Sequence, residues 1–339
     1  YNSIIASGLV PADDVTLFHS RFNGHDRQLI ESRILSMFGS DVSNRPKRHI
    51  VIGTQVIEQS LDLDFDIMFT DIAPIDVILQ RAGRLHRHSY TPRPRGLSAP
   101  RLVVMGASDG NDFDSGSLYV YGMGRLKNMS KLLRSSALLP DVMKIPDDID
   151  CLIQRGYDYS VIPIGSDIDV LSKADGELLL ELDRKRDDAD NGVLLSPYGM
   201  RYANSPGSGQ FVLWGSNEMN MGGGTEESMS ATVRDSSSSL SVILLRRLDN
   251  GMLGFSSRDL DERYHGFYPE SVDDDMARLI LEQSISLPGI LSSPWIIDST
   301  IDVLEKERID AWQSSRILKG ELVLVMDNKP LRVKGSDYN

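Results

Sequence analysis

The sequence predicts an α/β protein in which a parallel sheet flanked by helices precedes a smaller α+β domain. Its 339 residues exceed the usual size of one domain, and 40% hydrophobic content is enough for ordinary cores. Short apolar runs alternate with helical patterns over the first hundred residues, which is typical of βαβ units. We place the first domain at residues 1–110, a connector helix at 111–145 and an accessory domain at 146–339.

The first domain contains apolar runs that predict strands at residues 15–18, 49–53, 65–70 and 101–105. Helical spacing of apolar residues predicts a helix over 26–38. Pro74 suits the first turn of a second helix ending near Arg84, because the N–H that proline lacks has no partner there. Tyr1 lies in what reads as the end of a helix, so we expect the preceding strand to be missing and the domain to be truncated at its N-terminus.

The rest of the chain is less regular. Apolar spacing predicts a connector helix over residues 115–139, which ends at Pro140. Residues 204–238 are rich in Ser and Gly and predict flexible loops around a short strand at 210–214. Further strands are expected at 239–246, 252–255 and 321–326, and helices at 273–282 and 301–315.

The charge of the chain is uneven. The formal net charge is −13, but residues 1–105 carry 12 Lys and Arg against 11 Asp and Glu, which leaves 24 against 38 for residues 106–339. The acidic excess therefore does not argue against a nucleic-acid partner for the first domain. A single cysteine, Cys151, excludes an internal disulfide, and we expect it to be a small core residue. No stretch is long and apolar enough for a membrane span, and we expect a cytoplasmic protein.

Polar residues follow the first predicted strand. Ser20 and Arg21 are placed to hold a nucleic-acid phosphate, because ligands of open α/β sheets bind at the carboxyl ends of strands. The alternative is a solvated loop with a helix N-cap.

A second segment, residues 53–66, follows the next strand. Small residues there let backbone N–H groups approach a phosphate, and Thr54 adds a hydroxyl donor. Asp62 could accept a hydrogen bond from a ribose hydroxyl. Asp62, Asp64 and Asp66 would share one face of an extended segment, but a metal site there lacks a fourth ligand.

The third segment, residues 80–88, carries Arg81, Arg84 and Arg87 at a helix end and in the loop after it. Guanidinium groups stay ionised and match phosphate oxygens two at a time, which suits a polyphosphate ligand. A solvated surface is the alternative. A metal pair of His86 and His88 would lack further ligands.

These three segments, in this order and at these distances, resemble motifs IV, V and VI of the second RecA-like domain of superfamily 2 helicases. The amino-acid sequences of residues 54–62 (TQVIEQSLD) and 80–88 (QRAGRLHRH) closely resemble those of the CRISPR-associated helicase-nuclease of type I interference systems. Residues 231–235 and 318–324 resemble the C-terminal accessory domain of that family, so the likeness covers most of the chain.

The resemblance implies the C-terminal half of an ATP-dependent 3′-to-5′ single-stranded DNA helicase that degrades foreign DNA in CRISPR interference. It implies ATP and Mg²⁺, both bound mainly by a first RecA-like domain whose Gly-x-x-x-x-Gly-Lys-Ser/Thr loop does not occur in this sequence. The metal cluster of the family's nuclease domain is also not in this chain. We expect this chain alone to be inactive, with the missing N-terminal domains, single-stranded DNA and a guide-RNA surveillance complex as its partners.

The resemblance also assigns roles by position. Arg84 and Arg87 match arginine fingers, and Gln80 would orient water or the γ-phosphate. Asp62, Arg81 and Gly83 fall on the nucleotide side of the site. The residues that would line the DNA track are Ser20, Arg21, Thr54 and Gln55.

Two alternatives stay open. The chain could be a non-catalytic docking or DNA-binding module for the effector complex. It could also be part of another superfamily 2 DNA translocase. The accessory domain offers no chemistry of its own, since His265 suits a packed or surface position. For Trp214, Trp295 and Trp312, core packing is favoured over stacking on bases.

Overall fold

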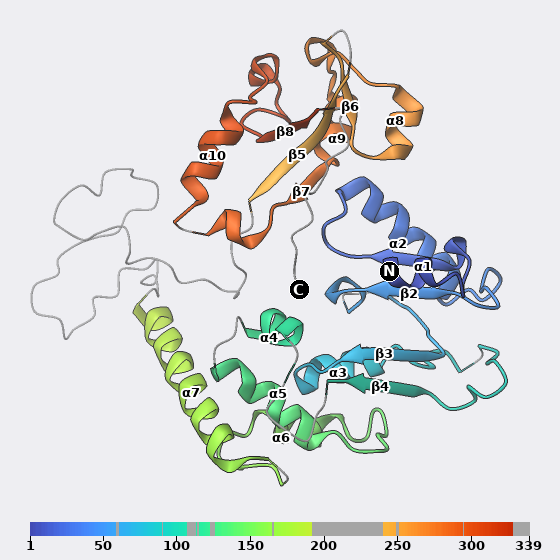
Figure 1. Ribbon diagram of the computed structural model, residues 1–339, viewed down its shortest axis with the longest axis vertical. Helices are drawn as coiled ribbons and strands as arrows, with labels where there is room; N and C mark the ends of the chain where they lie inside the picture. The colour runs from blue at the N-terminus through green and yellow to red at the C-terminus, as the bar shows by residue number, and fades with distance from the viewer. Residues whose placement is uncertain are drawn as a thin grey trace, which may run out of the picture. The chain divides into compact units, whose positions relative to one another are not determined.

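The computed structural model describes residues 1–58, 61–89, 91–106, 113, 115–122, 126–164, 166–191, 240–248, 251–293 and 295–327. The chain divides into two compact units, shown in Figure 1. The first unit comprises Tyr1–Thr70, Asp76–Met105 and Ser236–Asn339, and the second comprises Asp71–Ile75 and Gly106–Asp235. None of the helices in the described ranges is long and apolar enough to cross a membrane. The domain boundaries expected from the sequence stay a prediction.

The first unit opens with helix α1 (Asn2–Ser7), strand β1 (Val15–Phe18), helix α2 (Gly24–Phe38) and strand β2 (Ile50–Gly53). β1 and β2 are parallel, in a register that pairs Phe18 with Gly53. The two strands agree with the sequence pattern, whereas Tyr1, expected in the end of a helix, is the N-cap before the first helical residue, Asn2. A buried core of Phe18, Ile34, Phe38, Leu61 and Leu63 joins β1, α2 and the extended segment after β2.

Strand β3 (Ile67–Asp71), helix α3 (Ile75–Ala82) and strand β4 (Arg101–Met105) follow. β3 pairs with β4 in a two-stranded sheet separate from the β1–β2 pair. The expected single parallel sheet is therefore seen as two pairs of strands within the described ranges. The third predicted strand begins two residues later than expected, because Phe65 forms only an isolated bridge with Leu85.

The C-terminal part of the first unit is built around strand β5 (Ser241–Arg247). Strands β6 (Leu253–Phe255) and β7 (Ser284–Ser286) run antiparallel to β5 along one edge, and β8 (Val323–Met326) runs parallel to it along the other. The strands expected here agree with β5, β6 and β8, whereas the three-residue β7 was not predicted.

Helices cover this sheet in the order α8 (Arg258–Tyr264), α9 (Asp274–Leu281) and α10 (Ile297–Glu305). The helix expected at 273–282 agrees with α9, which Asp273 caps by accepting a hydrogen bond from the Met276 N–H at 2.8 Å. The helix expected at 301–315 is wrong. The chain forms α10 and then a separate 3-10 turn, Asp310–Ser314, that carries the buried Trp312. Helix α8 was not predicted.

The second unit is helical, with α4 (Ser115–Gly122), α5 (Leu126–Leu138), α6 (Ile149–Tyr157) and α7 (Ile168–Asn191). The single connector helix expected at 115–139 is seen as α4 and α5, and neither α6 nor α7 was predicted. A fully buried Arg134 on α5 is paired with Asp175 on α7, which ties the two helices together. The strand expected at 210–214 and the loops at 204–238 lie outside the described residues.

Candidate phosphate site

The four residues predicted to touch nucleic acid lie at one sheet edge. The parallel register of β1 and β2 brings their carboxyl ends together, and the Thr54 N–H donates a hydrogen bond to the Phe18 carbonyl oxygen at 3.3 Å. Ser20 and Arg21 follow β1, Thr54 and Gln55 follow β2, and all four are exposed. This edge therefore presents hydroxyl, amide and guanidinium donors to solvent.

The second and third predicted segments are joined by backbone hydrogen bonds. The Phe65 N–H donates to the Arg84 carbonyl oxygen at 2.8 Å, and the His86 N–H donates to the Phe65 carbonyl oxygen at 3.1 Å. His86 has a φ of 48°, a left-handed conformation that non-glycine residues seldom adopt, so the chain turns sharply after this contact. The arginine segment is thus fixed beside the acidic segment.

Among the described residues, no carboxylate forms an ion pair with Arg84. Its guanidinium donates to the carbonyl oxygen of Leu61 and, at 3.1 Å, to that of Glu58, and it forms no ion pair within the described ranges. Its buried Nε has no hydrogen-bond partner there. Burial and the charge of Arg87 lower the pKa of Arg84, against an opposing effect of Asp62. The group stays ionised and suits an anionic ligand.

Arg87 is more accessible. Its Nε lies 2.5 Å from Oδ1 of Asp62, and the two side chains are 44% and 49% exposed. The Nε2 atom of His88 lies 3.5 Å from the same oxygen. Because exposed ion pairs contribute little free energy, Arg87 can leave Asp62 at small cost.

Arg81 is held by other side chains. Its Nε donates to Oε1 of Glu58 at 2.8 Å, and its Nη1 donates to the Thr70 hydroxyl at 2.6 Å. These contacts fasten α3 to the loop after β2, through Glu58, and to β3, through Thr70. Gln80 is exposed on the last turn of α3, and the Gly83 N–H donates to the Leu79 carbonyl oxygen at 2.9 Å. The nucleotide-side roles of Arg81 and Gly83 stay predictions.

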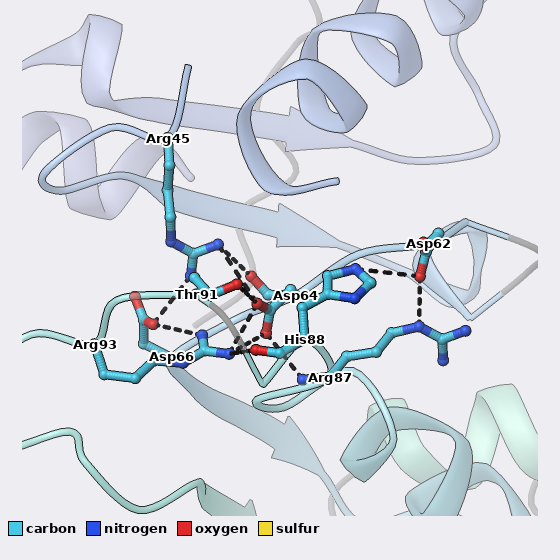
Figure 2. A network of polar contacts seen from close by, with 8 residues as sticks. All are labelled: Arg45, Asp62, Asp64, Asp66, Arg87, His88, Thr91 and Arg93. Carbon is cyan, nitrogen blue, oxygen red and sulfur yellow. Dashed lines mark hydrogen bonds and ion pairs between the residues drawn. The ribbon is translucent and has the colours of Figure 1, made fainter. Parts of the chain in front are cut away.

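Two arginines that the sequence analysis did not single out neutralise the acidic segment (Figure 2). Arg93 Nη2 lies 2.7 and 2.8 Å from the two carboxylate oxygens of Asp64, and its Nη1 lies 2.9 Å from Asp66. Arg45 reaches Asp66 at 3.0 Å and donates to the Asp64 carbonyl oxygen at 2.8 Å. Arg45 and Arg93 are 10% and 11% exposed, so this is a largely buried network.

Asp64 is the centre of the network. Its carboxylate is completely buried and also accepts hydrogen bonds from the Thr91 hydroxyl at 2.7 Å and the Arg87 N–H at 3.0 Å. Burial raises the pKa of Asp64, but hydrogen bonds from Arg93 and Thr91 and the charges of Arg93 and Arg45 together hold it below its usual value. An ionised Asp64 therefore positions the backbone of Arg87.

The expectation that Asp62, Asp64 and Asp66 share one face agrees with the packing of the alternating residues Leu61, Leu63 and Phe65 against one core, although the aspartates have different partners. Asp64 and Asp66 face Arg45 and Arg93, whereas Asp62 lies apart beside Arg87 and His88 (Figure 2). No group of three metal-binding side chains occurs in the part of the chain that the structure describes.

Outside this site, two expectations are corrected. Trp295 is 78% exposed and Cys151 is exposed, so neither packs in a core. Trp312 is a core residue, as expected, and its indole N–H donates to the Pro269 carbonyl oxygen at 3.2 Å. His265 is an exposed residue that ends α8 with a φ of 54°. Trp214 lies outside the described residues.

Comparisons with known proteins match both ends of the chain. The family model described as "CRISPR-associated nuclease/helicase Cas3, C-terminal" matches residues 1–90, and the "Cas3 C-terminal domain" model matches residues 234–336. The CRISPR-associated nuclease/helicase Cas3 of Streptococcus thermophilus is 32% identical over 325 residues, which are 93% of this chain and 33% of the relative. This chain thus spans about a third of the length of that relative.

Solved structures agree in fold. The crystal structure of T. fusca Cas3 has a TM-score of 0.67 at 24% identity and covers 96% of this chain and 34% of its own. A structure of a "CRISPR RNA-guided surveillance complex, pre-nicking" has a TM-score of 0.60 at 22% identity and covers 96% of this chain and 36% of its own. These likenesses show that the chain shares the α/β fold of those structures.

Proposed function

Since this chain belongs to the C-terminal portion of the CRISPR-associated Cas3 nuclease/helicase family, we propose that it is the C-terminal half of an ATP-dependent 3′-to-5′ single-stranded DNA helicase. In this proposal it supplies arginine fingers and DNA contacts to an enzyme that degrades foreign DNA in CRISPR interference. The observation that carries the proposal is Arg84, which forms no ion pair in the described part of the chain, beside the exposed Arg87–Asp62 pair.

The chemistry of this pair fits a polyphosphate. Within the described ranges Arg84 donates only to carbonyl oxygens, and its Nε has no partner. An anion bound here would therefore be attracted by the guanidinium charge and could accept a hydrogen bond from Nε. Arg87 can exchange Asp62 for a phosphate oxygen, because both its own side chain and that carboxylate are nearly half exposed. The pair would then stabilise negative charge that develops on a γ-phosphate, an effect worth about 10³ to 10⁵ in rate in other enzymes.

Other residues would complete the nucleotide side. Gln80, exposed at the end of α3, would orient water or the γ-phosphate. ATP and Mg²⁺ would be held mainly by the first RecA-like domain of the family. A bound phosphate would compete with Asp62 for Arg87, which couples the two segments that carry these residues.

The sheet edge after β1 and β2 would track the DNA backbone. Thr54 and Ser20 offer hydroxyl groups, Arg21 a guanidinium and Gln55 an amide, and all of these are exposed donors for phosphate oxygens. Such contacts carry no sequence information, so the binding would be sequence-tolerant and salt-dependent. We propose the cytoplasm as the site of action, with a guide-RNA surveillance complex as the partner that delivers DNA.

The arginine roles are tested by steady-state ATP hydrolysis with single-stranded DNA. The 339-residue chain alone should not turn over ATP. In the full-length protein, Arg84→Ala and Arg87→Ala should each lower kcat by about 10³ or more. Arg101→Ala, which removes an exposed arginine at the start of β4, should leave kcat unchanged. Turnover by the isolated chain that does not respond to Arg84→Ala would contradict the proposed division of labour.

A second candidate is a docking module for the effector complex. The acidic excess of residues 106–339, with 24 basic against 38 acidic residues, favours it for that part of the chain. Salt-dependent binding of an oligo-dT strand that is lost in Arg21→Ala and Thr54→Ala would favour the helicase half. Binding to the protein complex alone, unaffected by these two variants, would favour docking.

A further inference from the structure

We call the part of the first unit that contains β5–β8 and α8–α10 the C-terminal sheet domain. A set of polar contacts, which we call the His25 clamp, fastens the first turn of α2 to this domain. On the α2 side it consists of Asn23, His25 and Asp26, and on the C-terminal side of Ser256, Ser257, Asp259, Glu282 and Gln283. The C-terminal residues come from the junction of β6 with α8 and from the turn between α9 and β7. Two loops of one domain therefore converge on one helical turn of the other.

The His25 ring lies between two carboxylates. Its Nδ1 is 3.0 Å from Oε2 of Glu282, and its Nε2 is 3.1 Å from Oδ2 of Asp259. Both ring nitrogens therefore lie within hydrogen-bonding distance of a carboxylate oxygen. The histidine is 13% exposed, and its two partners are 41% and 42% exposed. Arg263 also reaches Asp259 at 3.1 Å, so that carboxylate contacts both His25 and Arg263.

A backbone hydrogen bond also joins α2 to the turn between α9 and β7. The His25 N–H donates to the Glu282 carbonyl oxygen at 3.1 Å. Gly24 permits this approach, because a Cβ at that position would meet the same oxygen at 3.0 Å. Helix α2 thus begins against the α9–β7 turn.

Buried polar groups complete the clamp. The fully buried Gln283 accepts hydrogen bonds from the Ser256 hydroxyl at 2.9 Å and from the Ser257 N–H at 2.8 Å. Ser256 in turn accepts from Asn23 Nδ2 at 3.2 Å, and the Ser257 hydroxyl donates to Asp26 at 2.5 Å. Asn23 also caps α2 by accepting from the Asp26 N–H at 2.8 Å. The cap of α2 and the β6–α8 junction are therefore one hydrogen-bonded unit.

We propose that His25 is a positioning residue that fixes the C-terminal sheet domain to the loop carrying Ser20 and Arg21. That loop ends at Asn23, so any shift of the clamped turn moves both side chains. The side-chain contacts described above between the two sides of the clamp are polar. Its effect on DNA binding rests on the proposed function, whereas the clamp itself does not.

Hydrogen exchange of the 339-residue chain tests the clamp. Glu282→Gln and His25→Ala should speed exchange at residues 24–27 and 283–285 by about tenfold or more, because each removes a charge-assisted hydrogen bond. Exchange in β1 and in the centre of β5 should not change. Glu262→Gln is the matched control, because Glu262 is 64% exposed on α8 and pairs with Arg258. Unchanged exchange at both sides of the clamp would overturn the proposal.

The same variants test the positioning role. Their affinity for an oligo-dT strand, measured by fluorescence anisotropy, should fall several-fold while the thermal midpoint of the chain stays within a few degrees. Faster exchange without any loss of affinity would refute the positioning role. If the unaltered chain binds no DNA, the proposed function fails and the exchange data alone decide the clamp. Faster exchange throughout β5 in His25→Ala would mean that this variant loosens the whole C-terminal sheet. The Glu282→Gln result then decides whether the clamp exists, because Glu282 is 42% exposed and the substitution leaves no buried cavity.

Discussion

Replacing Asp64 by Asn should destabilise the first unit by about 3 kcal/mol. Removing one partner of a buried ion pair usually costs about 3–5 kcal/mol, because a buried charge is left without compensation. Here Asp64 is completely buried, and Arg93 contacts both of its oxygens at 2.7 and 2.8 Å. Asp66 remains as a partner of Arg93 at 2.9 Å and of Arg45 at 3.0 Å, so we expect the low end of that range.

Scanning calorimetry of the 339-residue chain measures the effect. A loss of about 3 kcal/mol should lower the midpoint of the first unit by about 6–12 °C. Glu262→Gln removes an exposed ion pair and should change the unfolding free energy by less than about 1 kcal/mol. If Asp64→Asn and Glu262→Gln give equal midpoints, then the network does not stabilise an ionised Asp64.

Acid provides an independent check on Asp64. Its pKa in the folded chain is held below the usual value, whereas in the unfolded chain it should be about 3.9. The stabilisation is therefore fully present above about pH 4 and is lost as the pH falls through the folded pKa. The difference in unfolding free energy between the unaltered chain and Asp64→Asn should be constant from about pH 7 to pH 5 and shrink only below about pH 4.

Three further outcomes are expected. Glu58→Gln should cost about 1–3 kcal/mol in the same calorimetry, because the 16%-exposed Arg81 loses its ion pair with Glu58. Asp175→Asn should cost the second unit about 3–5 kcal/mol, seen as a lower midpoint of helical circular dichroism, because Arg134 is fully buried. Burial and a nearby arginine charge lower the pKa of His49, so its protonation favours the unfolded chain. The urea concentration at the unfolding midpoint should therefore decrease as the pH is lowered below about 6.5. His49→Gln should remove the part of this decrease that comes from His49.

The fold was predictable where the period of the sequence was clear. Strands β1, β2, β5 and β8 have continuous apolar runs, and α9 has a capping aspartate, so each agrees with its pattern. Helix α7 was missed because most of its exposed face is charged and its buried residues, such as Leu171 and Ala174, are few. Strand β7 has only three residues, Ser284–Ser286, and is a strand through its pairing with β5 and not through its own composition.

The site was predictable in its chemistry but not in its pairing. The arginines of residues 81–87 were recognised by type and spacing, yet only the fold shows that Arg81 belongs to Glu58 and that Arg84 has no carboxylate among the described residues. Arg45 and Arg93 were missed because each stands far in sequence from Asp64. A usable signal was present, since carboxylates are almost never fully buried without a cation, and three aspartates alternate with apolar residues after Leu61.

The division of the first unit over both ends of the chain has a consequence for how the chain can vary. Residues 106–235 leave that unit after β4 and return before β5. The entropy lost on closing such an excursion grows only with the logarithm of its length, at about 0.6 kcal/mol for each doubling. The second unit can therefore lengthen or shorten considerably while the folding of the first unit is almost unaffected in free energy.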